Sequence, residues 1–443
     1  MRYPKYKDSG VEWIGEIPVH WEVKKLKFLG ESIIGITYNP KNITTDNGYL
    51  VLRASNIQNG KLNMNDCVYI NIDIPEKLLI KKGDILICAR SGSQHLIGKN
   101  ICINKEIEHC TFGVFMTVFR TKYYKFISKY FNSQVFIGQS SLFLTTTINQ
   151  LTKSTLNNFI IALPSFPEQT QIANFLDRKT KLIDTLIEKK QKQIELLKEQ
   201  RAAVINQVVT KGLNPDVPMK DSGVDWLGEI PEHWEVKNLK YLIYLINKKT
   251  KSLQDISLKI SLESIESKTG KLLQEYSNFG GIGCLFKKGD ILFSKLRPYL
   301  AKVIIAPDNG QAVGELLVLR PKKECGTRFL FYRILSNSFI SIVDGSTYGT
   351  KMPRANWEFI GNLSLPKPPL LEQTQIADFL DCEIKKIGDQ IDKINQQIDL
   401  LKEYRTTLIS EAVTGKIDVR SESQMDADAA DDTDEQLSMI NKQ

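Results

Sequence analysis

The chain has 443 residues, 42% of them hydrophobic and 25% charged, which is enough for about two or three globular domains. It has no apolar run near the roughly 18 residues of a membrane-spanning helix, and its start, MRYPKYKDSG, is too polar for a signal peptide, so we expect a soluble cytoplasmic protein. The net charge of +8 becomes +14 over residues 1–420, because residues 421–443 hold seven acidic side chains and one lysine. A chain this basic favours a polyanionic partner, nucleic acid first. A solvated surface could carry the same surplus of positive charge.

A segment near the start of the chain returns in its second half. Residues 7–29, KDSGVEWIGEIPVHWEVKKLKFL, and residues 220–242, KDSGVDWLGEIPEHWEVKNLKYL, are identical at 18 of 23 positions. This duplication predicts two tandem units, each with a leading segment, a lobe and a long helix. The simplest role for the repeated tryptophans and isoleucines is to pack each lobe against the helices.

The two lobes, residues 1–163 and 213–366, diverge in sequence but share landmarks. Both contain Lys-Lys-Gly-Asp followed by an apolar run, at residues 81–87 and 287–293, which predicts a turn into a buried strand. Both have a later apolar strand that ends in arginine, Arg120 or Arg320, and both close with a strand that runs into proline. Each lobe is therefore predicted to be a mixed α/β domain on one plan with different loops.

The loops of the two lobes hold basic, aromatic and small polar side chains. Arg, Asn and Gln can read base edges through paired hydrogen bonds, while Lys and hydroxyl groups hold phosphates. The same composition is ordinary in loops, so we weigh the set rather than any one member. The candidate DNA contacts of the first lobe are Arg53, Asn56, Arg90, Ser91, Gln94, Lys99, Thr145, Thr146, Asn149 and Lys153. Those of the second lobe are Lys248, Lys249, Lys295, Arg297, Tyr299, Lys302, Tyr348, Lys351 and Arg354.

A long amphipathic helix also occurs twice. It begins at PEQTQIANFLD, residues 167–177, and again at LEQTQIADFLD, residues 371–381. Apolar residues recur at alternating steps of three and four over about four heptads, which is typical of a coiled coil. We expect helices over residues 164–212 and 367–420 that pack on each other. Their seam residues are Leu176, Ile183, Ile187, Ile194, Leu197, Leu380, Ile387, Ile391, Ile394, Ile398 and Leu401.

The direction of these helices follows from connectivity. A helix of about 40 residues carries the chain roughly 60 Å, so the second copy meets the first along its whole seam, without a long return loop, only if it runs back. The predicted fold class is therefore α+β, with two mixed α/β lobes, one near each end of an antiparallel two-helix coiled coil. Residues 421–443 have too few apolar side chains to fold and are expected to be disordered.

Arg201 and Arg405 occupy matching positions in the two predicted seams. An unpaired buried guanidinium is costly, so each arginine should reach a carboxylate or lie where the seam opens. We interpret them as devices that fix the register of the helices, with a partner contact as the second reading.

Motifs for catalysis are weak. The glycine-rich run SNFGGIG, residues 277–283, imitates an S-adenosylmethionine loop of amino-methyltransferases, but it precedes a turn into a strand, and the Pro-Pro-aromatic motif of those enzymes is absent. Asp225, Glu235 and Lys237 could be drawn as a metal nuclease, yet the HWEVK run that supplies two of them recurs at residues 20–24. We predict no catalytic residue.

The seven cysteines form no C-x-x-C pair, which favours reduced thiols in a cytoplasm. Cys88, His95, Cys102 and His109 recur every seven residues, but in stretches that read as strand and loop, where this period aligns nothing. We predict no metal site.

With these elements in place, the chain resembles the specificity subunit of type I restriction-modification enzymes. The features that carry the resemblance are the duplicated WIGEIPxHWEVKxLK segments, the duplicated (P/L)EQTQIAxFLD helix starts and the seam helices that end in LLKExR. Two lobes that alternate with two shared-sequence helices cover about 420 residues, so the match is nearly complete and specific. The acidic tail is outside the pattern.

The resemblance implies a non-catalytic subunit that binds double-stranded DNA. Each lobe would read one half of a gapped, asymmetric site, and the helices would set the gap. Two methyltransferase subunits would dock on the shared segments and bring S-adenosylmethionine, and motor-nuclease subunits would bring ATP and Mg²⁺. The subunit itself would hold no cofactor.

Two other functions stay open at this point. One is a coiled-coil adaptor that binds only proteins, and the other is a self-contained DNA methyltransferase or nuclease. DNA binding that weakens steeply with salt would distinguish the first, and activity of the isolated chain would reveal the second.

Overall fold

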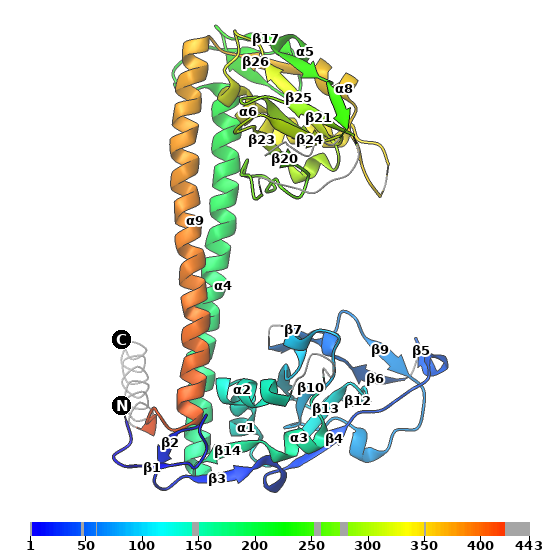
Figure 1. Cartoon of the computed structure of the whole chain (residues 1–443), viewed down its shortest axis with the longest axis vertical. Coiled ribbons are helices and arrows are strands. Elements are labelled where there is room, and N and C mark those ends of the chain that lie inside the picture. Colours follow the sequence, from blue (N-terminus) through cyan, green and yellow to red (C-terminus); the bar gives the residue numbers. More distant parts are fainter. Residues whose placement is uncertain are drawn as a thin grey trace, which may run out of the picture. The chain divides into compact units, whose positions relative to one another are not determined.

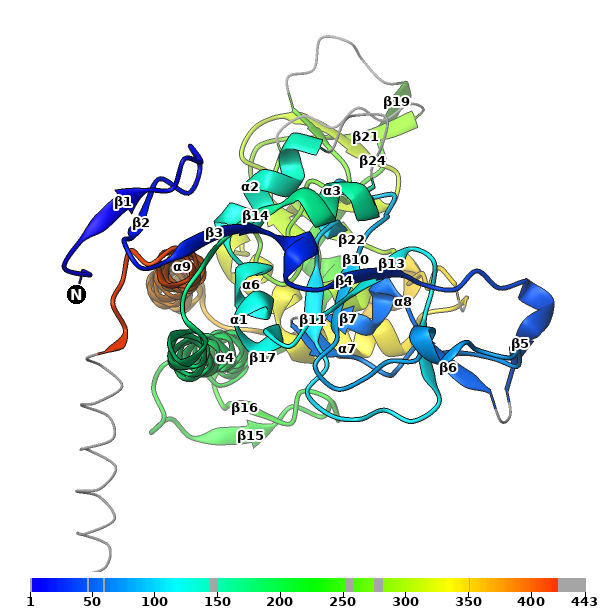
Figure 2. The same cartoon turned by 90° about the horizontal axis from the view of Figure 1, so that it is seen from below.

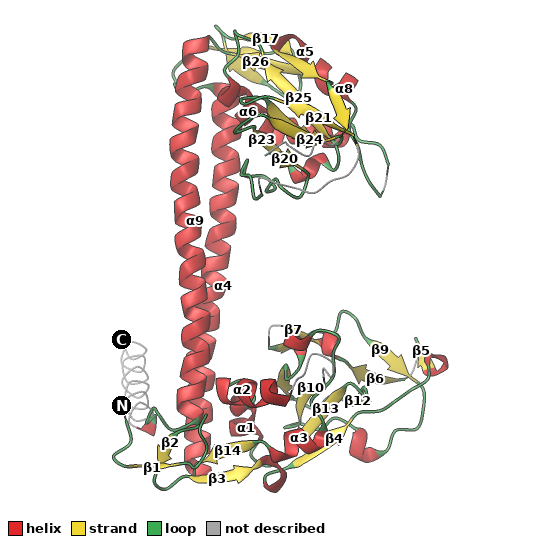
Figure 3. Ribbon diagram, in the orientation of Figure 1, coloured by secondary structure: helices red, strands yellow, loops and turns green. Residues whose placement is uncertain are grey.

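The computed structural model describes residues 2–45, 48–58, 60–143, 150–251, 258–274, 282–349 and 351–420. The chain divides into two compact units, unit 1 comprising Met1–Lys189 and Gln396–Gln443, and unit 2 comprising Lys190–Asn395. Each unit combines one lobe with part of both long helices, as Figures 1 and 3 show element by element. The predicted tail lies outside the described residues.

The elements of unit 1 begin with the leading segment and end in the first long helix. They are β1 Tyr6–Asp8, β2 Glu16–Pro18, β3 Glu22–Lys25, β4 Glu31–Ile34, β5 Ile43–Thr44, β6 Tyr49–Leu52, β7 Ile57–Gln58, β8 Lys61–Leu62, β9 Val68–Ile70, β10 Ile85–Cys88, β11 Asn100–Cys102, β12 Cys110–Phe112, β13 Met116–Arg120, α1 Tyr124–Tyr130, α2 Gln134–Phe143, α3 Lys153–Asn158, β14 Ile160–Leu163 and α4 Phe166–Lys211.

The elements of unit 2 follow the same order. They are β15 Met219–Asp221, β16 Glu229–Pro231, β17 Glu235–Asn238, α5 Leu239–Leu242, β18 Ile243–Ile246, β19 Lys249–Lys251, β20 Lys259–Ile260, β21 Ile282–Phe286, β22 Ile291–Ser294, β23 Val303–Ile305, β24 Gly310–Val313, β25 Leu316–Pro321, α6 Thr327–Leu335, α7 Asn337–Gly345, α8 Trp357–Asn362, β26 Ser364–Lys367 and α9 Leu370–Val413.

Each lobe contains two four-stranded sheets. Their strand orders are β11-β10-β13-β4 and β12-β6-β9-β5 in unit 1, and β18-β25-β22-β23 and β19-β21-β24-β20 in unit 2. One apolar cluster joins the two sheets of a lobe, and a second joins the first sheet to the short helices and the long helices. In unit 1, α1 and α2 lie between the β10–β13 sheet and the long helices (Figure 1). The prediction of mixed α/β lobes is confirmed.

The landmark strands are where the sequence predicts them. The Lys-Lys-Gly-Asp turns lead into β10 and β22, each buried at all four residues. These strands pair antiparallel with β13 and β25, the two strands predicted to end in arginine. The runs into proline form β14 and β26, which pair with β3 and β17 of the leading segments.

A buried ion pair fixes these strands at the same place in both lobes. Asp84 and Asp290 end the Lys-Lys-Gly-Asp turns, and their carboxylates are only 1% and 2% exposed. Each accepts two hydrogen bonds of 2.7 Å from a guanidinium, Arg120 in lobe 1 and Arg320 in lobe 2. Each also accepts the backbone N–H of the lysine that opens its turn, at 2.8 Å. The two sequence landmarks are therefore the two partners of one interaction.

The leading segments are buried where they meet the helices, as predicted. Trp21 belongs to a cluster with residues at the start of α4 and the end of α9, and Trp234 belongs to one with residues at the end of α4 and the start of α9. Because opposite ends of the helices share each cluster, α4 and α9 run antiparallel within each unit. The β1–β2 hairpin lies beside the end of α9 (Figure 2).

A glutamate at the first turn of each long helix anchors this junction. Glu168, on α4, accepts the Tyr3 hydroxyl at 2.6 Å and lies 3.0 Å from His20 Nε2. Glu372, on α9, accepts Trp234 Nε1 at 3.0 Å and lies 2.8 Å from His233 Nε2. A carboxylate is favoured here because the first turn of a helix presents unpaired N–H groups.

A glycine ends each long helix at the same junction. Gly212 follows α4 and Gly415 follows α9, both with left-handed backbone, at φ +78° and +73°. A Cβ at Gly415 would lie 2.4 Å from the Pro18 ring. Glycine is therefore needed both for the turn and for the close approach of the leading segment.

The predicted seam residues are all buried or half-buried along α4 and α9. Arg405 donates to the Asp184 carboxylate at 2.8 and 3.2 Å, as expected for a seam arginine that reaches an acid. Arg201 instead donates to the Lys268 carbonyl at 2.7 Å, beside a cavity of about 340 Å³. The supercoiling of a coiled coil, and the placement of the lobes about the helix pair, stay predictions. No helix in the described ranges is apolar over a length that would cross a bilayer.

Arg333 carries a buried charge with no acidic partner. Its side chain is 0% exposed, it stacks on the Trp226 ring at 4.8 Å, and Nη1 donates to the Ser336 and Ser338 hydroxyls. Nε and Nη2 have no partner among the residues that the structure describes. Burial lowers the pKa of Arg333 to about 9. The unfolded chain therefore binds this proton more tightly than the folded protein does, so the charge opposes folding at neutral pH.

We predict that Asp290→Asn lowers the free energy of unfolding by about 3–5 kcal/mol, because it leaves the Arg320 guanidinium without its carboxylate partner. Denaturant titration of the full chain measures the loss. Asp389→Asn, at an exposed position of α9, is the matched control and should change stability by less than about 0.5 kcal/mol. Equal stabilities of the two variants would contradict the role given to the ion pair.

We predict that replacing Arg333 does not lower the free energy of unfolding, in contrast to replacing Asp290. Arg333→Met keeps the apolar stem and removes an unneutralised charge, so the variant should be as stable as the parent or more stable. The same change at Arg320 strands the buried Asp290 carboxylate and should cost about 3–5 kcal/mol. Thermal unfolding of both variants provides the comparison, and an equal loss in both would refute the assignment.

Candidate nucleic-acid interface

The predicted loops of lobe 1 come together in the structure. The chain after β10 meets the chain before α3, because Arg90 pairs with Gln150 in an isolated β-bridge and Leu151 N–H donates to the Ala89 carbonyl at 2.7 Å. Arg90 is exposed, and its guanidinium lies 5.5 Å from the ring centre of Phe115. This junction presents a cation on an aromatic platform, a combination that suits phosphate and base contacts.

Lobe 2 joins the matching loops in the same way. Arg297 N–H donates to the Pro353 carbonyl at 2.8 Å, and Ala355 N–H donates to the Lys295 carbonyl at 2.9 Å. The segments around residues 295–302 and 346–357, which sequence analysis selected separately, therefore form one surface. It exposes Tyr348 and Tyr299, at 65% and 46%.

The turn that carries Tyr299 has strained backbone. Arg297 and Ala301 bracket the short 3₁₀ helix Pro298–Leu300, and both have left-handed backbone, at φ +48° and +46°. Residues with a Cβ rarely adopt this conformation, and they do so mostly where a site needs a particular side-chain direction. The strain supports a functional role for this turn.

Several predicted contacts are already bonded within the protein. Asn56 is wrong as a DNA contact, because it is 0% exposed, its Oδ1 accepts Arg53 N–H, and its amide donates to two backbone carbonyls. Arg53 pairs with Asp66 at 2.9 Å. In lobe 2, Arg354 donates to both Glu315 oxygens and Lys302 Nζ donates to the Leu262 carbonyl. These side chains hold loops in place.

The remaining candidates divide by exposure. Lys153, Lys248, Lys249 and Lys351 are exposed, while Ser91, Lys295 and Arg297 are half-buried. Thr145, Thr146 and Asn149 lie outside the described residues. These remaining candidates stay predicted DNA contacts.

Phe115 is absent from the predicted set. The sequence pattern predicts this residue within a buried strand, but β13 begins one residue later, at Met116, and the Phe115 ring is 56% exposed. The preceding Gly113 and Val114 were the available signal, since a glycine breaks the alternation expected of a strand.

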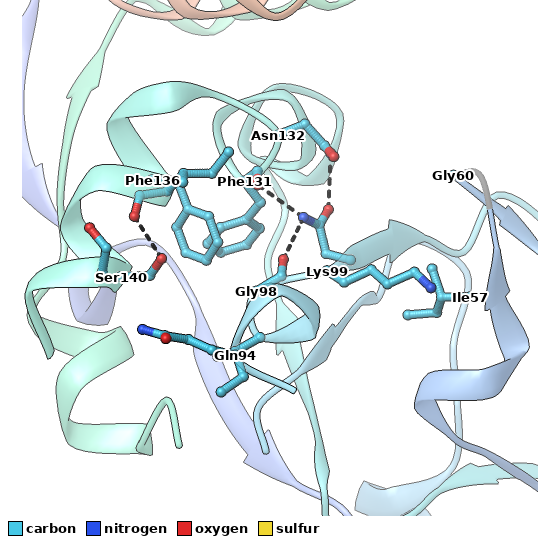
Figure 4. A pocket seen from close by; sticks show the side chains of 13 residues that line it. Ile57, Gly60, Gln94, Gly98, Lys99, Phe131, Asn132, Phe136 and Ser140 are labelled. Atoms are coloured by element: carbon cyan, nitrogen blue, oxygen red, sulfur yellow. Dashed lines mark hydrogen bonds between the residues drawn. The ribbon is translucent and has the colours of Figure 1, made fainter. Parts of the chain in front are cut away.

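A cavity of about 720 Å³ opens beside the lobe 1 junction (Figure 4). Gln94 and Lys99, both predicted contacts, line it together with Phe131, Phe136 and Asn132. Gln94 and Lys99 both belong to the predicted set, but no sequence pattern predicts that α1 and α2 supply the opposite wall.

Three cysteines of lobe 1 have thiols that are buried or half-buried. Burial raises the pKa of Cys102 to about 11 and that of Cys110 to about 12, and it also raises the pKa of Cys88. These thiols are protonated at neutral pH, and the thiolate is the reactive form. Within the described ranges, no group of three or more His, Cys, Asp or Glu side chains is placed to hold a metal ion.

A family model described as "Type I restriction modification DNA specificity domain" matches the chain twice, over residues 18–196 and 231–400. The chain is 27% identical over 299 residues to the type I restriction enzyme MjaVIII specificity subunit of Methanocaldococcus jannaschii, covering 62% of this chain and 66% of that relative. It is 25% identical over 451 residues to the MjaIX specificity subunit of the same organism, covering 92% and 95%.

A solved chain from work on complex assembly and conformational transition of the type I R-M system has a similar fold. It superposes with a TM-score of 0.67 at 15% identity and covers 90% of this chain and 99% of its own length. The two matched regions correspond to the two tandem units read from the sequence, and each ends within a long helix.

Proposed function

Since this chain belongs to the type I restriction-modification DNA specificity family, we propose that it is the subunit that reads the DNA sequence in a type I restriction-modification complex. One observation carries the proposal: two units share a leading segment, an ion-paired sheet and helix junctions, but present different loops at the same place. Such a molecule suits a bipartite site, because a common frame holds two dissimilar reading surfaces. Each lobe reads one half-site.

The long helices would set the gap between the half-sites. At about 1.5 Å per residue, the 46 residues of α4 extend over about 69 Å. Two sites on one face of DNA lie about 35 Å apart per helical turn, within the reach of such a helix. The antiparallel contact of α4 and α9 within each unit supports their role as one stiff element.

The subunit would also dock its partners. Two methyltransferase subunits would bring S-adenosylmethionine, and motor-nuclease subunits would bring ATP and Mg²⁺; all would act with this subunit in the cytoplasm. Leu196 and Leu400 support two copies of one partner, because both are exposed and occupy matching positions in the two helices. The repetition, rather than the exposure, carries this support, because single exposed apolar side chains are ordinary.

Catalysis belongs to those partners in this proposal. Glu235, from the nuclease alternative, forms surface ion pairs with Lys237 at 3.0 Å and Lys367 at 3.6 Å. The other alternative, an adaptor that binds only proteins, gives no reason for loops that differ between two matching lobes.

The direct test is reconstitution. The chain together with a methyltransferase subunit and S-adenosylmethionine should methylate DNA at a gapped site, whereas the chain alone should neither methylate nor cleave. A gel-shift titration should show affinity that falls steeply with salt, as phosphate contacts require. Activity of the isolated chain, or binding that is independent of salt, would refute the proposal.

We predict that exchanging residues 30–160 for the corresponding lobe of a relative changes one half-site and leaves the other and the gap intact. The reason is that lobe 1 and lobe 2 have separate cores and separate loop junctions. Methylome sequencing of a strain that carries the chimaera reads both half-sites. A change in both halves would contradict separate reading.

We predict that adding seven residues to each long helix, after Lys189 and after Asn395, lengthens the gap by up to about three base pairs, the rise of seven helical residues. Seven residues preserve the phase of the seam. Both half-sites should be unchanged in the methylome. An unaltered gap would contradict the role of the helices as a spacer.

A further inference from the structure

The cavity of lobe 1 has an aromatic floor. Phe131 and Phe136 meet edge to face, with ring centres 4.8 Å apart and planes at 69°. Ile57 and Ile97 continue the apolar lining, and Figure 4 shows Lys99 extending along the side of Ile57. An apolar floor lowers the local dielectric constant and so strengthens a charge interaction made above it.

Two polar side chains that line the cavity, Asn100 and Asn132, form hydrogen bonds within the protein. The Asn100 amide donates to the Gly98 carbonyl at 3.0 Å and to the Phe131 carbonyl at 2.9 Å. Its Oδ1 accepts the Asn132 amide at 3.0 Å. This chain of bonds ties the β10–β11 turn to α1 and fixes the shape of the wall.

Ser140 and Ser141 also line the cavity and donate to the Ile137 and Gly138 carbonyls, whereas Gln94 and Lys99 are not bonded in this way. Gln94 and Lys99 make no side-chain hydrogen bond or ion pair with any residue in the described part of the chain, and both line the cavity. Gln94 lies four residues after Arg90, so the cavity adjoins the loop junction of lobe 1. The Lys99 ammonium and the Gln94 amide, beside an apolar floor, suit an anionic ligand that forms hydrogen bonds.

Lobe 2 offers a matched position without this property. The Lys99 carbonyl accepts Cys88 N–H at 2.8 Å, and the Lys302 carbonyl accepts Ser294 N–H at 3.0 Å, so the two lysines occupy equivalent places after β10 and β22. Lys302, however, turns its Nζ inward to the Leu262 carbonyl. The same backbone position therefore presents a free cation in one lobe and a structural one in the other.

We propose that the lobe 1 cavity is a DNA subsite in which Lys99 holds a backbone phosphate of the first half-site and Gln94 hydrogen-bonds the nucleotide beside it. The proposal rests on the proposed function and adds an asymmetry to it. A phosphate suits the ammonium, and a glutamine amide both donates and accepts, as a base edge requires. The positive charge of residues 1–420 favours a polyanionic occupant, and the proposed function identifies that occupant as DNA.

The test compares Lys99→Ala with Lys302→Ala in the reconstituted complex with its methyltransferase subunits. The observed DNA-binding constant is measured at several salt concentrations. Each phosphate contact contributes about 0.9 to the slope of log K against log salt, so Lys99→Ala should make the slope shallower by about that amount. Lys302→Ala should leave the slope unchanged, and Lys99→Arg should restore it.

Gln94→Ala supplies a second readout. It should leave the salt slope unchanged but reduce the preference for the cognate first half-site over single-base variants by about fivefold to a hundredfold, the range for a lost base contact. Preference at the second half-site should not change. Thermal unfolding of each variant, matched to the parent, shows that the fold is retained.

An unchanged slope for Lys99→Ala would overturn the subsite. If Lys99→Ala weakened assembly with the methyltransferase subunit while the slope stayed the same, the cavity would be a protein contact, and the proposal would again fail. Failure of the proposed function looks different, because then the parent complex itself would show no salt-dependent DNA binding.

Discussion

The structure depends on the carboxylate at the first turn of each long helix. Glu168 and Glu372 each receive hydrogen bonds from aromatic and imidazole groups of a leading segment, at the point where the other long helix ends. The helix N-terminus favours the charge, and the tryptophan beside it fills the space between the two helices and the lobe. Other polar contacts join each lobe to the helices as well, such as Arg328 with Asp378 and Tyr332 with Asp381 in unit 2. The glutamate contact is the one that recurs at the same position in both units.

Much of this frame could be predicted because its signals are local or repeated. The sequence alone predicts the Lys-Lys-Gly-Asp turns, the strands that lead to Arg120 and Arg320, and the long helices. It does not predict their meeting, because pairing of Asp84 with Arg120 joins residues far apart in sequence, and no local pattern encodes it. The repeated sequence therefore predicts the turns, strands and helices, whereas the ion pair between them is seen only in the folded structure.

The reading surfaces could be predicted only as a set. Composition cannot separate a buried asparagine that braces a turn from an exposed one that contacts a ligand, and Asn56 proved to be the former. Nor can it show that Lys99 points into a cavity while Lys302 is bonded to a carbonyl. Both outcomes depend on which carbonyl groups the loop leaves within reach. In the proposed function, the DNA specificity of each lobe depends on which loop side chains are free and which are bonded within the protein. Sequence patterns give little information about that.

The division of the chain has a consequence for synthesis. Unit 2 is a continuous stretch, but unit 1 is completed by residues after Gln396, and the Arg420 guanidinium lies 4.7 Å from the Tyr3 ring centre. At about 5–20 residues per second, roughly 10 to 50 s pass between the emergence of Glu168 and that of Gly415. During that interval the Trp21 cluster lacks the residues that α9 supplies, so the core of unit 1 is completed only after unit 2 has been made. The nascent chain should need chaperone protection at its N-terminal half.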